Sequence, residues 1–222
     1  MRNLNIFIFT FFIVSSCEVV EGPYQNEINN NGSSETILQK ILIEDFTGHT
    51  CMNCPDAATE LESIKELYPN QVIGIAIHVG NTFARPLPPN SSNKYLTDFR
   101  TKWGEEIDNY FEVSSVGLPK GMINRKDEEP KSKDDWGNVV SEIINNSAIF
   151  DIDISASPFV FGDCDIEVIV KALENVDGEY NIVIALTEDS IVDWQKNGSY
   201  DDSLYVHNLS LIHISEPTRH TR

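Results

Sequence analysis

The sequence predicts a mixed α/β protein in which an α/β domain is followed by an antiparallel β segment. Two patterns carry this prediction. Residues 37–79 read as a strand, a helix and a second strand, which is the order of a βαβ unit with parallel strands. From Ile149 onward, apolar and polar residues alternate in short runs separated by turn residues. The second pattern is typical of antiparallel strands and predicts a β-sandwich-like domain that is truncated.

The chain begins with an apolar segment that is too short to span a bilayer as a helix. Arg2 precedes an apolar run from Ile6 to Val14, so residues 1–16 read as an export signal. The segment Val14-Ser15-Ser16-Cys17 resembles a lipobox, in which the cysteine is acylated and becomes the new N-terminus. The alternative is an ordinary signal peptide with a chance cysteine. Two acyl chains on Cys17 would anchor the mature protein to a membrane as a lipoprotein.

Residues 17–35 are rich in Asn, Gly and Ser and contain little to bury, so they predict a flexible linker. The acidic residues just after Cys17 resemble those of lipoproteins sent to the outer membrane or the cell surface. The expected location is therefore the outer membrane, with the protein lipid-anchored and either periplasmic or surface-exposed.

The composition is strongly acidic, with 16 Lys and Arg against 35 Asp and Glu. Without the signal and the last 14 residues, 13 basic and 34 acidic residues are left, which gives a net charge of −21 (13 − 34). Such a surface repels the phosphates of nucleic acids, so we expect no nucleic-acid partner.

The last residues differ in character from the rest of the chain. Residues 209–219 resemble the translation of a sequencing adapter, so we interpret residues 209–222 as an artefact and expect the natural protein to continue past Asn208. The alternative is a genuine terminal strand followed by a basic tail.

The elements of the α/β domain follow in order. A β-rich run ends at Asp45, and a helix over residues 55–68 is predicted by apolar residues at helical spacing, with Pro69 ending it. The apolar run 71–79 suits a buried strand. A Pro-rich loop then leads to a predicted helix over residues 94–111, a strand after Pro119, and a helix over residues 134–146. Predicted strands follow at 149–157, 164–173 and 180–188.

Cys51 and Cys54 stand between the first strand and the first helix. Asp45 lies six residues before Cys51, and Val116-Gly117-Leu118-Pro119 precedes a predicted strand. These features resemble the thioredoxin superfamily, in which an acidic residue lies beneath a dithiol and a cis-proline loop faces it. The resemblance implies a thioredoxin-like domain over residues 36–147, followed by a partial β domain over residues 148–208.

The resemblance also implies thiol–disulfide exchange with protein thiols and disulfides. Cys51 would be the attacking sulfur, stabilised as a thiolate by the helix N-terminus, and Cys54 the resolving sulfur. Asp45 would take the proton from Cys54, and Pro119 would present neighbouring backbone to an extended substrate.

Several residues depart from the thioredoxin pattern. Thr50 precedes the first cysteine in place of tryptophan, and Met52-Asn53 separates the pair in place of Gly-Pro. Negative charges nearby, at Glu44, Asp56 and Glu60, would disfavour a thiolate. A Cys51–Cys54 disulfide that only braces the fold therefore stays open as the alternative.

A metal site is a weaker interpretation of the same cysteines than a disulfide. Beyond them, the candidate ligands are His49, His78 and Cys164, which do not make up a second ligand pair. We interpret Cys164 as a small buried residue of a strand and His78 as a structural histidine at the strand edge near the cysteines. The sequence thus predicts no metal and no cofactor.

A closer resemblance covers more of the chain. The lipobox, the segment around "EDFTGHTCMNCP", the run "VIGIAIHVG" and the later β segment resemble the Omp-twenty-eight-related outer-membrane lipoproteins. This resemblance implies location more than activity. The leading interpretation is a thiol–disulfide oxidoreductase, and the alternative is a surface binding or adhesion lipoprotein without catalysis.

Overall fold

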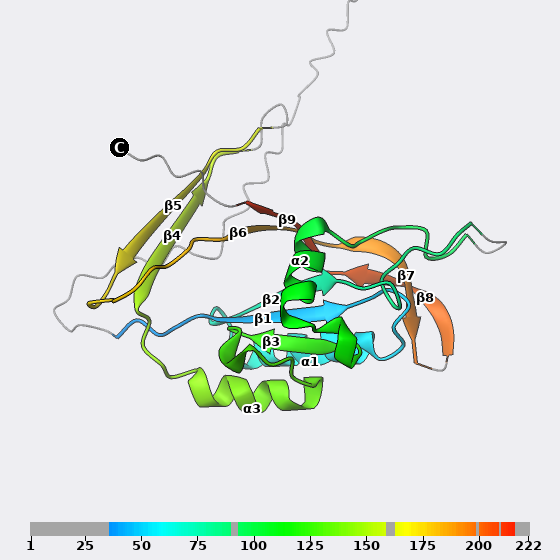
Figure 1. Ribbon diagram of the computed structural model, residues 1–222, viewed down its shortest axis with the longest axis horizontal. Helices are drawn as coiled ribbons and strands as arrows, with labels where there is room; N and C mark the ends of the chain where they lie inside the picture. Colours follow the sequence, from blue (N-terminus) through cyan, green and yellow to red (C-terminus); the bar gives the residue numbers. More distant parts are fainter. Residues whose placement is uncertain (1–35, 90–92, 159–162, 199, 209, 216–222) are drawn as a thin grey trace, which may run out of the picture. The chain divides into compact units, whose positions relative to one another are not determined.

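The computed structural model describes residues 36–89, 93–158, 163–198, 200–208 and 210–215. These residues form a mixed α/β fold with three α-helices, one five-stranded sheet and two separate two-stranded sheets (Figure 1). The predicted α/β class is confirmed. In chain order the elements are β1 (Ile41–Thr47), α1 (Cys54–Leu67), β2 (Val72–His78), α2 (Lys102–Phe111), β3 (Lys120–Ile123), α3 (Lys133–Ile143), β4 (Phe150–Ala156), β5 (Ile166–Ala172), β6 (Ile184–Glu188), β7 (Ile191–Asn197), β8 (Tyr200–His207) and β9 (Ser210–Ser215), with short 3-10 turns at Ser114–Val116 and Lys126–Glu128.

The five-stranded sheet has the order β3-β1-β2-β9-β6. β1 and β2 pair in parallel over their whole length, from Ile41 opposite Val72 to Thr47 opposite His78. The predicted βαβ unit is therefore present, because α1 joins these two parallel strands. β3 pairs with β1 in the antiparallel sense.

Side chains alternate between the two faces of the sheet and meet different helices on each face. On one face, α1 and α3 pack over β1 and enclose a core in which Ile41, Ile43 and Trp136 are fully buried. On the other face, Phe46 and Met122 pack with side chains of α2 (Figure 1). Consecutive residues of β1 therefore lie in two different environments.

The second helix is shorter than the sequence predicted. It begins at Lys102, whereas the apolar pattern suggested a start near residue 94. Tyr95 has a left-handed backbone (φ 61°), which a helix does not accept. The Thr101 side chain then caps the helix by accepting a hydrogen bond from the Gly104 amide at 3.0 Å. Thr101 therefore marks the start of α2, and the apolar residues before it belong to a loop.

The described strands from β4 onward form three antiparallel pairs, as predicted, but one of these pairs belongs to the five-stranded sheet, where β9 lies parallel to β2. β4 pairs with β5, β7 pairs with β8, and β6 pairs with β9, which also joins the edge of β2. The β4–β5 hairpin is amphipathic, because its register places apolar residues of both strands on one face. These are Phe150, Ile152, Ile154, Ala156, Ile166, Val168, Val170 and Ala172.

Candidate functional site

The cysteine pair lies where β1 leads into α1. Cys54 is the first residue of α1, and it forms a disulfide bond with Cys51 in the preceding loop. The predicted disulfide is therefore present. Each cysteine is only 2% exposed, so the bond is closed to bulky reactants in this state.

Asp45 lies on the face of β1 that α1 covers. Alternation along β1 places it on the same face as Ile41 and Ile43. Its carboxyl group is 2% exposed, and its Oδ1 has no hydrogen-bond partner among the described residues. Burial raises the pKa of Asp45 to about 7. The neutral acid is therefore present at neutral pH, ready to give or take a proton.

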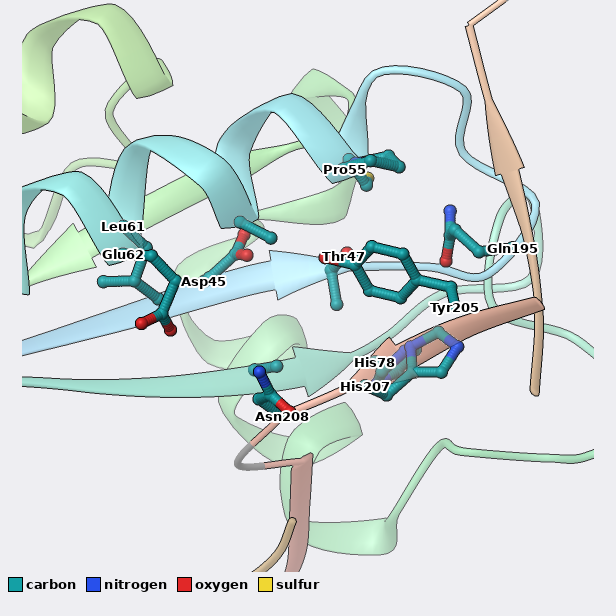
Figure 2. Close-up of a pocket in the computed structure, with 13 residues that line it drawn as sticks. Asp45, Thr47, Pro55, Leu61, Glu62, His78, Gln195, Tyr205, His207 and Asn208 are labelled. Carbon is teal, nitrogen blue, oxygen red and sulfur yellow. The ribbon is translucent and has the colours of Figure 1, made fainter. Parts of the chain in front are cut away.

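A cavity of about 60 Å³ is lined by both Asp45 and Cys54. Figure 2 shows side chains around this cavity. It is large enough for a few water molecules, and its wall offers several polar groups that could bind them. The residues that line it come from β1, α1, β2, β7 and β8: Asp45, Thr47, Cys54, Pro55, Ala58, Leu61, Glu62, Ala76, His78, Gln195, Tyr205, His207 and Asn208.

Pro119 lies in the loop before β3, and the Leu118–Pro119 peptide bond is cis. The next residue, Lys120, pairs with Phe46 of β1. Pro119 is thereby placed beside the end of β1 that leads toward Cys51. The structure brings this loop and the cysteines to the same end of strand β1.

The β7–β8 hairpin is bonded to the cysteine loop by main-chain and side-chain hydrogen bonds. The Lys196 amide donates to the His49 carbonyl at 2.9 Å, and the Gly198 amide donates to the Met52 carbonyl at 2.9 Å. Between them, the Gln195 side-chain amide donates to the Cys51 carbonyl at 3.0 Å and to the Gly48 carbonyl at 3.3 Å. The hairpin thus follows the main chain of the loop from residue 48 to residue 52.

Three buried histidines lie beside this contact. His78 ends β2, His207 ends β8, and His49 precedes the cysteines. The rings of His78 and His207 are 5.4 Å apart, and Phe99 lies 4.9 Å from each of them and 5.9 Å from the His49 ring. Both ring nitrogens of His49 and His78, and Nε2 of His207, have no hydrogen-bond partner among the described residues. We call His49, His78 and His207 the histidine cluster.

Burial keeps the histidine cluster neutral. Desolvation is the main cause that lowers the pKa of all three side chains, to about 4 for His207. The positive charges of the other histidines act in the same direction on His78 and His207. Asp193 opposes the effect on His49 and His207.

Two sequence-based expectations about single residues are corrected by the structure. Cys164 was expected to be buried in a strand, but it is an exposed free thiol just before β5, and its sulfur donates to the Ser157 carbonyl at 3.1 Å. Glu44 was expected to add negative charge near the cysteines. It points to the α2 side of the sheet instead and forms an ion pair with Arg125.

Among the described residues, no group of three or more His, Cys, Asp or Glu side chains is placed to hold a metal ion. Sequence reasoning missed Gln195, Tyr205 and His207, because they lie more than 140 residues after the cysteines. Nothing in the local pattern of β7 and β8 indicates that these strands return to the cysteine loop.

Comparisons with known proteins give similarity at the level of fold. No family model matches the sequence, and no curated protein matches it. The structure resembles that of HBP35 of Porphyromonas gingivalis, with a TM-score of 0.56 at 15% sequence identity, over 81% of this chain and 57% of that chain. A crystal structure of protein AGR_C_4864 from Agrobacterium tumefaciens matches with a TM-score of 0.48 at 13% identity, over 81% of this chain and 72% of that chain.

The part of the chain that the structure describes contains no helix long and apolar enough to cross a membrane. The predicted signal, lipidation site and linker lie outside the described residues.

Proposed function

We propose that this protein is an exported lipoprotein whose thioredoxin-like domain exchanges thiols and disulfides through Cys51 and Cys54. The observation that carries the proposal is the position of the disulfide. Its second cysteine, Cys54, is the first residue of α1 and lines the same cavity as the buried carboxyl group of Asp45. The pKa of Asp45 is raised to about 7. An acid with this pKa is matched to proton transfer near neutral pH.

The chemistry follows from this arrangement. A substrate thiolate attacks Sγ of Cys51, the Cys51–Cys54 bond breaks, and Cys54 leaves as a thiolate that receives the proton of Asp45. A second substrate thiolate then attacks the substrate sulfur of the mixed disulfide and releases Cys51 as a thiolate. The substrate dithiol is oxidised by two electrons, and the Cys51–Cys54 disulfide is reduced. The reverse sequence reduces a substrate disulfide.

The test is an insulin-reduction assay with dithiothreitol as reductant, together with the reduction potential of the Cys51–Cys54 pair. All proteins carry Cys164→Ser, so that the exposed thiol does not contribute. We expect Cys51→Ser to abolish activity and Cys54→Ser to accumulate mixed disulfides with substrate, since the resolving sulfur is lost. Trapping by Cys51→Ser instead would reverse the assignment of the two sulfurs.

A second candidate function is surface binding or adhesion, with a disulfide that only braces the fold. The observation in its favour is the burial of both cysteines under the β7–β8 hairpin. A potential well below that of glutathione, together with no insulin reduction, would support this candidate and refute the first.

The proposal includes a location at the outer membrane. The resemblance of the sequence to Omp-twenty-eight-related lipoproteins supports an outer-membrane protein, anchored by lipid on Cys17 and facing the periplasm or the outside. The later strands support a β-sandwich-like domain, because the β4–β5 hairpin carries one apolar face of the kind that a second sheet covers.

A further inference from the structure

The disulfide is covered by a hairpin that is held by specific hydrogen bonds. Lys196, Gly198 and Gln195 donate the hydrogen bonds that hold β7 against residues 48–52. Elsewhere the hairpin is tied to the loop before α2, where Lys94 bonds Asp202 at 3.3 Å and lies 4.2 Å from the centre of the Trp194 ring. Among the described strands, β7 and β8 pair with each other and with no strand of the main sheet.

The histidine cluster connects this hairpin to the α/β part. His207 belongs to β8, whereas His78 belongs to β2 and His49 to the cysteine loop. The buried ring nitrogens of His78, and Nε2 of His207, have no hydrogen-bond partner among the described residues, so a proton added to either ring gains no acceptor to offset the burial of its charge. Two positive charges with ring centres 5.4 Å apart repel each other, and each also loses its hydration.

We propose that the β7–β8 hairpin is an acid-released cover: protonation of the histidine cluster separates His207 from His78 and His49, lifts the hairpin, and uncovers the Cys51–Cys54 disulfide. This device goes beyond the exchange chemistry proposed above and does not depend on it, because a disulfide can be covered and uncovered whether or not it is catalytic.

The neighbouring charges fix the direction of the pH response. The groups that face the histidine cluster are the carboxylates Asp193 and Asp98, the guanidinium of Arg100, the phenols Tyr95 and Tyr205, and the buried acid Asp45. Asp193 and Asp98 favour protonated His49, but desolvation is larger, and the pKa stays below that of an exposed histidine. The covered state therefore binds fewer protons than the open state.

The sign of the effect follows from this difference in bound protons. The covered state is fully favoured above the pKa of a solvated histidine, 6.5, and loses its advantage as the pH falls below that value. With a pKa of about 4 when covered, His207 alone would raise the open fraction about 30-fold between pH 8 and pH 5. Protonation of His49 and His78 adds to this change.

The experiment measures access to the disulfide in the oxidised full chain. The rate at which tris(2-carboxyethyl)phosphine reduces Cys51–Cys54 is followed from pH 8 to pH 5, and each rate is divided by that of oxidised glutathione at the same pH. We expect the normalised rate to rise at least 10-fold toward pH 5. His78→Gln and His207→Gln, which each remove a titrating ring but keep a polar side chain, should each lower the rise. The triple variant that also carries His49→Gln should lower it to below 3-fold.

Hydrogen exchange of the wild-type protein separates opening of the cover from general unfolding. The amides of Lys196 and Gly198 should lose protection toward pH 5, after correction for intrinsic rates, while amides of β1 keep theirs. A normalised reduction rate that does not change with pH, or equal loss of protection in β1, would overturn the proposal. So would a full acid response in the triple variant. Failure of the insulin assay alone would leave the cover intact and refute only the exchange function.

Discussion

Arg125 forms a two-bond ion pair with Glu44, with its Nε 2.8 Å and its Nη2 2.7 Å from the two carboxylate oxygens. The Glu44 side chain is only 4% exposed, and the next residue along β1 is the buried, unpaired acid Asp45. Adjacent carboxyl groups of one strand thus have opposite surroundings. Glu44 pairs with Arg125 on the α2 side of the sheet, and Asp45 lines the cavity that Cys54 also lines.

Removal of Arg125 should be costly, because it leaves the Glu44 carboxylate buried without a counter-charge. We expect Arg125→Met to lower the free energy of unfolding by about 2–3 kcal/mol, below the full cost of a broken buried pair since Arg125 is partly exposed. Urea unfolding measures this, and adding Glu44→Gln should restore most of the loss. The matched control is Lys126→Met, which breaks the exposed pair with Glu142 and should cost under about 0.5 kcal/mol.

Asp45 should make stability depend on pH. Its pKa is raised in the folded state, so its contribution is complete below the unfolded pKa near 3.8 and is lost as the pH rises through about 7. Relative to wild type, Asp45→Asn should therefore gain about 3 kcal/mol in unfolding free energy between pH 4.5 and pH 8. Urea titrations at the two pH values measure the difference, with the exposed Asp151→Asn as control. An equal effect of Asp45→Asn at both pH values would mean that Asp45 titrates normally.

Gly48 lies at the start of the cysteine loop, and the structure leaves no room for a side chain there. A Cβ at this position would lie 2.5 Å from the Phe83 carbonyl oxygen, which also accepts the Thr50 amide at 2.9 Å. We expect Gly48→Ala to cost about 1–3 kcal/mol and to displace the loop. Thermal unfolding checks the loss of stability.

The control for this substitution is Gly137→Ala in α3. The nearest atom to a Cβ there is 3.9 Å away, an ordinary contact. Alanine at an open position inside a helix should stabilise the protein by about 0.5–1 kcal/mol. Similar losses in both variants would show that the effect at Gly48 is not steric.

The lipid anchor is testable without the structure. We expect Cys17→Ala to abolish incorporation of labelled palmitate and to release the protein from the membrane fraction, because the acylated residue is removed. Unchanged labelling of that variant would exclude Cys17 as the acceptor. Cys164→Ser, which removes the exposed free thiol, is the control and should retain the label.

Much of the α/β part could be predicted from the sequence, because its signals are local. The apolar run of β2 and the helical spacing in α1 each place an element within a residue or two. The place of Asp45 beneath the cysteines was implied by the resemblance to thioredoxins and not by the local pattern of the strand. The start of α2 could not be predicted from the local pattern. The apolar residues before Thr101 continue the helical spacing, but the left-handed backbone at Tyr95 does not allow a helix there.

Of the later strands, β4, β5 and β6 could be recognised but not placed, whereas β7 and β8 were not predicted. Alternation identifies a strand and its two faces, and it does not say which strand it pairs with or what it covers. For this reason the sequence did not indicate that Gln195 and His207 reach the cysteine loop. The sequence placed His78 correctly at the strand end near the cysteines, whereas one of its two partners in the histidine cluster, His207, comes from β8.

The contact between Gln195 and Cys51 joins residues 144 positions apart. A ribosome makes the chain from its N-terminus, so the cysteine loop and α1 leave the ribosome well before β7 and β8 exist. During that interval the two cysteines are not yet covered, and afterwards the finished hairpin encloses them. The order of synthesis thus gives the Cys51–Cys54 pair a period of free access early in the life of the molecule, even under conditions that keep the mature protein closed.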